Sequence, residues 1–164
     1  MSKKVFCFYG HDPEKIGMKA CLSQWYPCRF TVDGHQYNCM EQCMMAGKAM
    51  TFKDFPTLID ILAEKDPKKI KALGRKVKHF DPVKWDEVKR DIVYKGNLAK
   101  FSQNPKLKEF LLSCGDVIFG EASPFDKIWG IGMRASEKAQ DPANWKGQNL
   151  LGYALTKVKE ELEK

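Results

Sequence analysis

Residues 40–50, "MEQCMMAGKAM", restrict more than any other stretch what this chain can fold into. They have the composition of a helix, and apolar side chains occupy almost its whole circumference. A helix that is apolar nearly all round belongs in the interior of a protein. It nevertheless contains Glu41 and Lys48, which lie seven residues apart and therefore return to nearly the same face. The sequence thus predicts a buried helix that holds a carboxylate and an amine on one stripe.

Two explanations of Glu41 and Lys48 are open at this point. In the structural one, Asn38 is the N-cap, Glu41 completes a capping box as its N3 partner, and Lys48 extends past the methionines to water. In the functional one, both groups stay buried. An unpaired charge near methionines is costly or neutralises itself. Such perturbed groups are what acid–base or imine chemistry requires.

Local patterns predict a mainly α-helical α+β protein with a small antiparallel sheet. "KVFCFYG" alternates like a short strand, "RFTVDGHQY" predicts a hairpin that turns at Asp33-Gly34, and residues 117–119 predict another short strand. Helices are expected at 54–64, 67–78, 82–101, 105–114 and 148–163, with prolines near most of their starts. No repeat or long linker interrupts the pattern, so we expect a single domain over residues 1–164.

The bulk properties of the chain limit its location and its partners. Its composition, 43% hydrophobic and 30% charged, is ordinary for a globular protein, and no apolar run reaches the roughly 18 residues of a membrane span. The start lacks the pattern of a secretory signal. We expect a cytoplasmic protein without membrane contact, with access to the nucleus left open. The net charge of +7 suits nucleic acid or a phosphate-bearing ligand, but a lysine-rich solvated surface explains it equally well.

The cysteines and the absent motifs narrow the chemistry further. A chain of 164 residues with six cysteines does not need a disulfide framework. His35, Cys39 and Cys43 are spaced four apart, but no fourth ligand is evident, so we expect reduced thiols and no metal. The chain has no G-x-S-x-G, H-E-x-x-H or P-loop motif. Any catalysis therefore rests on carboxylates, lysine and aromatic rings.

Two tryptophans are candidates for ligand contact. Trp129 lies in the glycine-studded loop "SPFDKIWGIG", and Asp126 precedes it by three residues. An aromatic face beside a carboxylate suits a nucleobase or nicotinamide-like ring together with a ribose hydroxyl or a developing cation. Trp85 begins the predicted helix "KWDEVKRDIVYKGNLAKF". A lone tryptophan is more often part of the core, and that alternative stays open for both.

Several motifs occur in an order that resembles the NADAR (YbiA-like) family. The matching segments are "VFCFYG", "LSQWYPCRFTVDGHQYNCMEQCMMAGKAMTFKD", "LGRKVKHFDPVKWDEVKRDIVYKGNLAKFSQN", "LLSCGDVIFGEASPFDKIWGIGM" and "WKGQNLLGYAL". The resemblance implies a compact, mostly helical single domain with a few strands. It also implies an N-glycosidase. Some members cleave the base–ribose bond of phosphorylated riboflavin-pathway intermediates, whereas others remove ADP-ribose from guanine in nucleic acid.

The resemblance also implies the site residues. Candidate catalytic residues are Glu41, Lys48 and Asp126, and candidate ligand-binding residues are Trp85, Trp129, Gly130, Gln24 and Tyr9. Two positions depart from the family pattern. The usual F-S-N-F is "LSQW" here, with Gln24 at the amide position, and the arginine often found in the last helix corresponds to Lys159. Lysine cannot replace arginine in bidentate phosphate binding.

From these residues we expect an enzyme that removes ADP-ribose from guanine bases in nucleic acid, as a monomer and without a cofactor. Lys48 forms a Schiff base with C1″ of the ribose or, in the alternative, holds a hydroxyl or phosphate while Glu41 activates water. Asp126 orients the ribose or stabilises positive charge, and the tryptophans stack against base and sugar. The other candidates are an N-glycosidase of riboflavin-pathway intermediates and a non-catalytic ADP-ribose reader.

Overall fold

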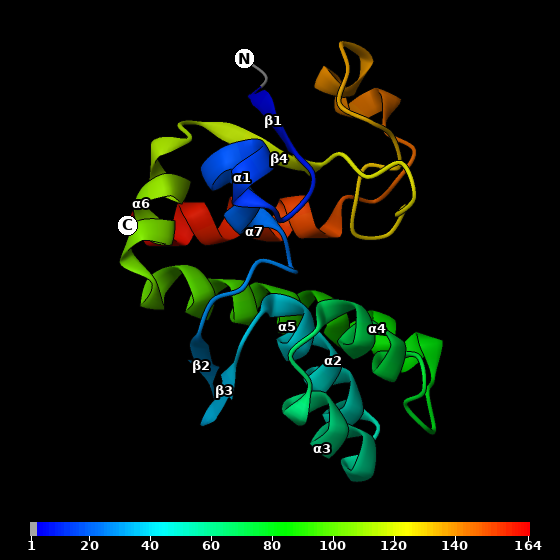
Figure 1. The fold of residues 1–164 in the computed structure, drawn as a ribbon. Coiled ribbons are helices and arrows are strands. Elements are labelled where there is room, and N and C mark those ends of the chain that lie inside the picture. Colours follow the sequence, from blue (N-terminus) through cyan, green and yellow to red (C-terminus); the bar gives the residue numbers. More distant parts are fainter. Residues whose placement is uncertain (1–2) are drawn as a thin grey trace. The chain divides into compact units, whose positions relative to one another are not determined.

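A computed structural model describes residues 3–164 of the chain (Figure 1). Its contacts divide the chain into two units, and each is described by itself. Unit 1 comprises the N-terminal residues up to Ser23 together with Pro105–Lys164, and unit 2 comprises Gln24–Asn104. Within the described range, no helix combines the length and the apolar character needed to cross a membrane.

Unit 2 contains the predicted hairpin. Strand β2 (Phe30–Val32) pairs antiparallel with β3 (His35–Tyr37). The two turn residues between them, Asp33 and Gly34, have φ values of 50° and 84°. Positive φ at both central residues is the type I′ geometry, which matches the twist of the strands. The small antiparallel sheet is therefore confirmed.

Helix α2 (Met40–Thr51) is the buried helix predicted from residues 40–50. It packs against α3 (Phe55–Ala63), α4 (Pro67–Gly74) and α5 (Pro82–Gln103), as Figure 1 shows. All the helices predicted in this unit are confirmed, although α4 ends earlier than expected. The starts of α3, α4 and α5 follow from local chemistry, because each has an aspartate at the N-cap and a proline in the first turn.

Two glycines allow the helices of unit 2 to approach α2 closely. A Cβ atom added at Gly74 would lie 1.9 Å from the sulfur of Met45. One added at Gly96 would lie 2.5 Å from the terminal methyl of Met40. These methionines therefore fill the space that the missing side chains leave, and they pack α2 closely against α4 and α5.

Unit 1 is built on a pair of parallel strands. Strand β1 (Lys4–Phe8) lies beside β4 (Val117–Glu121), with Lys4 opposite Val117. Helix α7 (Leu150–Leu162) packs against β4, and α6 (Pro105–Ser113) contacts α7. Both strands and both helices were predicted, but the parallel pairing of the strands was not.

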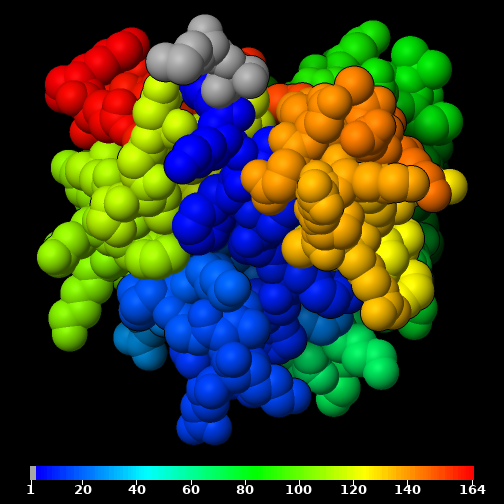
Figure 2. Space-filling model, turned by 90° about the horizontal axis from the view of Figure 1, so that it is seen from above, coloured from blue at the N-terminus to red at the C-terminus, as the bar shows by residue number. Residues whose placement is uncertain are grey.

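Four one- or two-turn helices were not predicted from the sequence. They are α1 (Pro13–Ile16), η1 (Gly17–Leu22), η2 (Lys138–Gln140) and η3 (Pro142–Asn144). A helix of one turn is too short to show a hydrophobic period. On the face of unit 1 seen in Figure 2, β1 and η1 (blue) lie between α6 (yellow-green) and the segment that carries η2 and η3 (orange).

Asn149 connects β4 to the start of α7. It is fully buried and has a left-handed backbone, with φ 53° and ψ 40°. Its side-chain carbonyl accepts the N–H of Glu121 at 3.1 Å, and its amide nitrogen donates to the carbonyl of Phe119 at 2.9 Å. These bonds tie the end of β4 to the start of α7, so both ends of the loop that contains Asp126 and Trp129 are fixed.

Candidate active site

The first turn of α2 places Glu41 in the protein interior. Its residue is only 4% exposed, and its backbone N–H donates to the carbonyl of Gln24 at 2.9 Å. The predicted capping box is wrong by one position. The N-cap is Cys39 rather than Asn38, and the side chain that reaches back to the N–H of Asn38, at 2.8 Å, is that of Gln42. The capping role that the structural explanation gave to Glu41 is therefore performed by Gln42.

Lys48 lies further along α2 under two aromatic rings. Its Nζ atom is 4.6 Å from the ring centroid of Phe80 and 6.0 Å from that of Trp85. Burial is the largest influence on the pKa of the Lys48 amine and lowers it. Glu41 raises this pKa and Arg75 lowers it further, and the net direction is down. Burial thus outweighs the opposing carboxylate, so the neutral, nucleophilic amine is favoured relative to an ordinary lysine.

Gln24 presents an unsatisfied polar atom in unit 2. The residue is 7% exposed, and its amide nitrogen contacts the sulfur of Met44 at 3.6 Å. Its buried carbonyl oxygen has no hydrogen-bond partner among residues 3–164. A buried acceptor without a partner is costly, and a ligand that donates a hydrogen bond would satisfy it. This keeps Gln24 a candidate for ligand contact, as predicted.

In unit 1, the carboxylate of Asp126 organises the loop after β4. Its Oδ1 atom accepts the backbone N–H groups of Ile128 at 2.9 Å and Trp129 at 2.8 Å. Its own N–H donates to the hydroxyl of Ser123 at 3.2 Å. Within residues 3–164, Oδ2 makes no such bond. One oxygen therefore fixes the turn, and the other has no hydrogen-bond partner within residues 3–164.

Trp129 and Gly130 follow in the same loop. Trp129 is half-buried, and its carbonyl accepts the N–H of Leu151 at 3.1 Å. Close packing explains why residue 130 is a glycine. A Cβ atom there would lie 2.9 Å from the carbonyl oxygens of both Asp126 and Glu121. The predicted ligand contacts of both residues remain predictions.

Tyr9 is 51% exposed and lines a pocket of about 550 Å³ in unit 1. The structure thus divides the predicted site residues between the units. Unit 2 brings together Glu41, Lys48 and Trp85, and it also carries Gln24. Unit 1 carries Tyr9, Asp126, Trp129 and Gly130.

Sequence reasoning missed Phe80, the ring nearer to the Lys48 amine, and Arg75, whose charge acts on it. Phe80 lies in a loop between helices, where no periodicity marks it. Lys159, the counterpart of the family arginine, is 6% exposed, and its amine pairs with Glu163 one turn further along α7. This buried amine is thus engaged by the C-cap residue of its own helix.

The cysteines are free thiols in the described part of the chain. Burial raises the pKa of Cys39 to about 11 and that of Cys43 to about 12. Both therefore stay protonated near neutral pH. Residues 3–164 contain no cluster of three or more His, Cys, Asp or Glu side chains placed to hold a metal ion.

Known proteins match this chain over almost its whole length. The NADAR domain family matches residues 7–163. An N-glycosidase of Acanthamoeba polyphaga mimivirus is 45% identical over 97% of this chain and 96% of its own length. A riboflavin biosynthesis protein of Vibrio vulnificus is 29% identical over 94% of this chain but only 38% of its own length.

A solved structure extends the similarity to the fold. The NMR structure of the Escherichia coli protein YbiA has a TM-score of 0.79 and 25% identity, and the match covers 99% of this chain and 87% of that one. A family match of this extent, a relative of nearly equal length at 45% identity and a shared fold agree with one another. The chain is a member of the NADAR family.

Proposed function

We propose that this protein is an N-glycosidase that removes ADP-ribose from guanine bases in nucleic acid. The name of the mimivirus relative supports the reaction class. The observation that carries the proposal is that a buried carboxylate, Glu41, acts electrostatically on the half-buried amine of Lys48, whose pKa burial lowers. The net charge of +7 supports a polyanionic substrate.

The proposed reaction begins at the aminal carbon, C1″ of the ribose. Glu41, protonated when the Lys48 amine is neutral, delivers its proton to the ring oxygen as the C1″–O4″ bond breaks, which leaves an imine between C1″ and the guanine amine. The neutral amine of Lys48 adds to C1″ and expels that amine, which takes up a proton. Water then hydrolyses the Lys48 Schiff base. The sum is substrate plus water giving ADP-ribose and the unmodified base, with the lysine regenerated.

Asp126 has a separate proposed role. Its Oδ1 atom is committed to the loop by two backbone N–H groups. We assign to Oδ2 the task of orienting the ribose or stabilising positive charge at C1″. Trp85 and Trp129 are proposed to stack against sugar and base.

Reductive trapping tests the covalent route. Sodium borohydride added during turnover of ADP-ribosylated guanine DNA should reduce the Schiff base, inactivate the enzyme and leave the mass of ADP-ribose on the peptide that contains Lys48. Lys48→Arg should give no adduct and no turnover. Recovery of fully active, unlabelled enzyme would instead assign the reaction to direct attack by water, with Glu41 as the base.

A second candidate substrate is a phosphorylated riboflavin-pathway intermediate, because the Vibrio relative is named for riboflavin biosynthesis. Parallel assays with ADP-ribosylated guanine DNA and a ribosylaminopyrimidine phosphate separate the two, and kcat/KM should be higher for the DNA. Glu41→Gln separates an enzyme from a reader. An enzyme loses turnover and keeps binding, whereas a reader keeps its whole function. Equal turnover of the DNA by wild type and Glu41→Gln would refute the proposed role of Glu41.

A further inference from the structure

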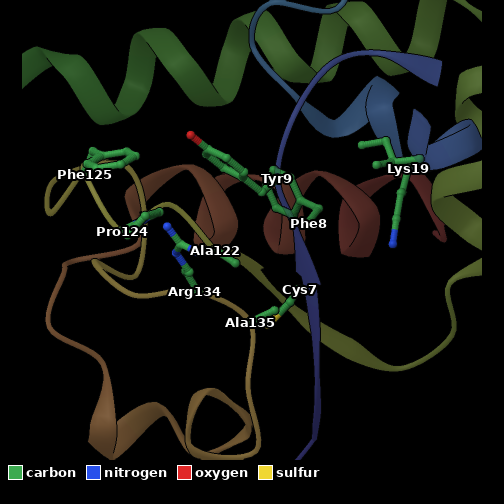
Figure 3. A pocket seen from close by; sticks show the side chains of 10 residues that line it. Cys7, Phe8, Tyr9, Lys19, Ala122, Pro124, Phe125, Arg134 and Ala135 are labelled. Carbon is green, nitrogen blue, oxygen red and sulfur yellow. The ribbon is translucent and has the colours of Figure 1, made fainter. Parts of the chain in front are cut away.

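The pocket in unit 1 has a volume of about 550 Å³ and is shown in Figure 3. This lies within the usual size range of small-molecule sites, about 300–1,000 Å³. Segments distant in the sequence line it: the end of β1, η1, the loop after β4, and the residues around Arg134. Of the predicted site residues, only Tyr9 is among the lining residues.

Two aromatic rings at this pocket are exposed far more than is usual for their type. Phe125 is 82% exposed and Tyr9 is 51% exposed, and Pro124 lines the pocket beside them. The backbone N–H of Phe125 donates to the hydroxyl of Ser123 at 3.3 Å, which holds this part of the loop in place. Flat apolar surfaces left in water at a pocket are suited to stack against a planar ring.

The charged side chains of the pocket are all positive. Arg134 and Lys19 line it, and no aspartate or glutamate does. Among residues 3–164, neither of the two cations makes an ion pair with a carboxylate. In Figure 3 the guanidinium of Arg134 lies on the same side of β1 as the rings of Tyr9 and Phe125, and Lys19 lies on the other side. Guanidinium and ammonium groups without protein partners favour phosphate oxygens.

We propose that this pocket binds the nucleoside diphosphate end of the substrate, with the base against Phe125 and Tyr9 and the phosphates at Arg134. This inference rests on the proposed function, since ADP-ribose ends in a purine nucleoside diphosphate. A phosphorylated ribosylaminopyrimidine shares the chemistry of a planar ring and a phosphate.

Calorimetric titration with ADP tests the site without turnover, because ADP lacks the bond that the enzyme cleaves. Arg134→Gln and Phe125→Ala should each weaken ADP binding by at least about tenfold. Tyr9→Phe keeps the ring and should change it little. Lys157→Gln and Phe55→Ala alter an exposed cation and an exposed ring outside the pocket, and both should bind ADP like wild type. All five positions are exposed, so each variant should keep its melting temperature.

Cysteine labelling provides an independent readout of the same site. Cys7 lines the pocket, whereas Cys114, also half-buried and in unit 1, does not. Saturating ADP should slow the reaction of iodoacetamide with Cys7 and leave that with Cys114 unchanged. Equal rates with and without ADP would count against the site.

The outcomes separate this inference from the proposed function. ADP affinity that is the same in wild type, Arg134→Gln and Phe125→Ala would overturn the pocket assignment. Binding of a ribosylaminopyrimidine phosphate without any binding of ADP would overturn it as well. Pocket-dependent ADP binding without turnover of any N-glycoside would uphold the pocket and refute the enzyme. Normal turnover with unchanged KM in both pocket variants would uphold the enzyme and refute the pocket.

Discussion

The amine of Lys48 lies 4.6 Å from the centre of the Phe80 ring. This contact joins the buried helix α2 to a loop that immediately precedes α5, and Trp85 adds a second ring at 6.0 Å. The rings keep water from one side of the amine, while their π faces attract its protonated form. Because these influences oppose one another, the charge of Lys48 responds to small changes in the neighbouring charges.

Removing the charge of Glu41 and removing the charge of Arg75 should shift the pKa of Lys48 in opposite directions. Glu41 raises this pKa, so Glu41→Gln should lower it. Arg75 lowers it, so Arg75→Gln should raise it. Only the neutral amine reacts with formaldehyde and cyanoborohydride, so the methylation rate of Lys48 plotted against pH should move to lower pH in the first variant and to higher pH in the second. Peptide mass spectrometry measures both curves.

Arg90→Gln is the matched control for these two variants. Arg90 pairs with Asp86 on the same unit and is not among the groups that influence the pKa of Lys48. Its curve should coincide with that of wild type. A shift of the same sign in Glu41→Gln and Arg75→Gln would show that the charges do not act as described.

Asp126→Asn should separate the chemical role of this carboxylate from its structural one. Asparagine keeps an oxygen that can accept the N–H groups of Ile128 and Trp129, so the melting temperature should stay within a degree or two. If Oδ2 stabilises charge at C1″, turnover should fall by about 100-fold. Asp126→Ala should lose both turnover and stability. An active Asp126→Asn enzyme would limit the residue to holding the loop.

Gly130→Ala should destabilise the protein by about 1–3 kcal/mol. The added methyl group would lie 2.9 Å from two backbone oxygens, which cannot move without distorting the loop. Gly120→Ala is the matched control, because its Cβ atom would meet only side chains, none closer than 3.4 Å. Urea unfolding of the two variants measures the difference. Equal stability would contradict the packing explanation of Gly130.

Asn149→Ala should cost about 2 kcal/mol or more, because it leaves the N–H of Glu121 and the carbonyl of Phe119 without their side-chain partner. Alanine must also adopt the left-handed backbone of this position. Asn144→Ala removes one exposed hydrogen bond to the carbonyl of Lys138 and should change little. Thermal unfolding followed by circular dichroism should place only the first variant well below wild type.

The six cysteines should react with iodoacetamide in an order set by their burial. Cys39 and Cys43, with pKa values raised to about 11 and about 12, hold almost no thiolate at pH 8. The half-buried Cys7, Cys28 and Cys114 should be modified first in the native protein, and the differences should disappear in urea. Mass spectrometry of the peptides gives each rate. Early modification of Cys43 would contradict the packing of α2.

Local structure that is set by residues adjacent in the sequence could be predicted. Asp33 and Gly34 specify their turn with two residues, and the aspartate–proline pairs specify where α4 and α5 begin. The buried nature of α2 followed from its composition alone. Its N-cap was wrong by one residue, because Asn38 is a better intrinsic cap than Cys39 and only the packing of the helix decides between them.

Features that depend on distant residues could not be predicted. The pairing of Lys4 with Val117 joins strands from opposite parts of the chain, and their local patterns contain no information about register. Phe80 reaches the amine of Lys48 only through the packing of α2 and α5. The direction of the Lys48 pKa shift was equally out of reach, since burial and the Glu41 charge oppose one another and only coordinates show which is larger.

The methionines seated against Gly74 and Gly96 give this protein a specific chemical vulnerability. Met40 and Met45 fill spaces in which a methyl group added at Gly96 or Gly74 would displace the thioether. A sulfoxide is larger, polar and chiral, so an oxidised side chain fits these apolar spaces poorly. Oxidation of Met40 or Met45 is therefore expected to weaken the packing of α2 against α5 or α4, respectively.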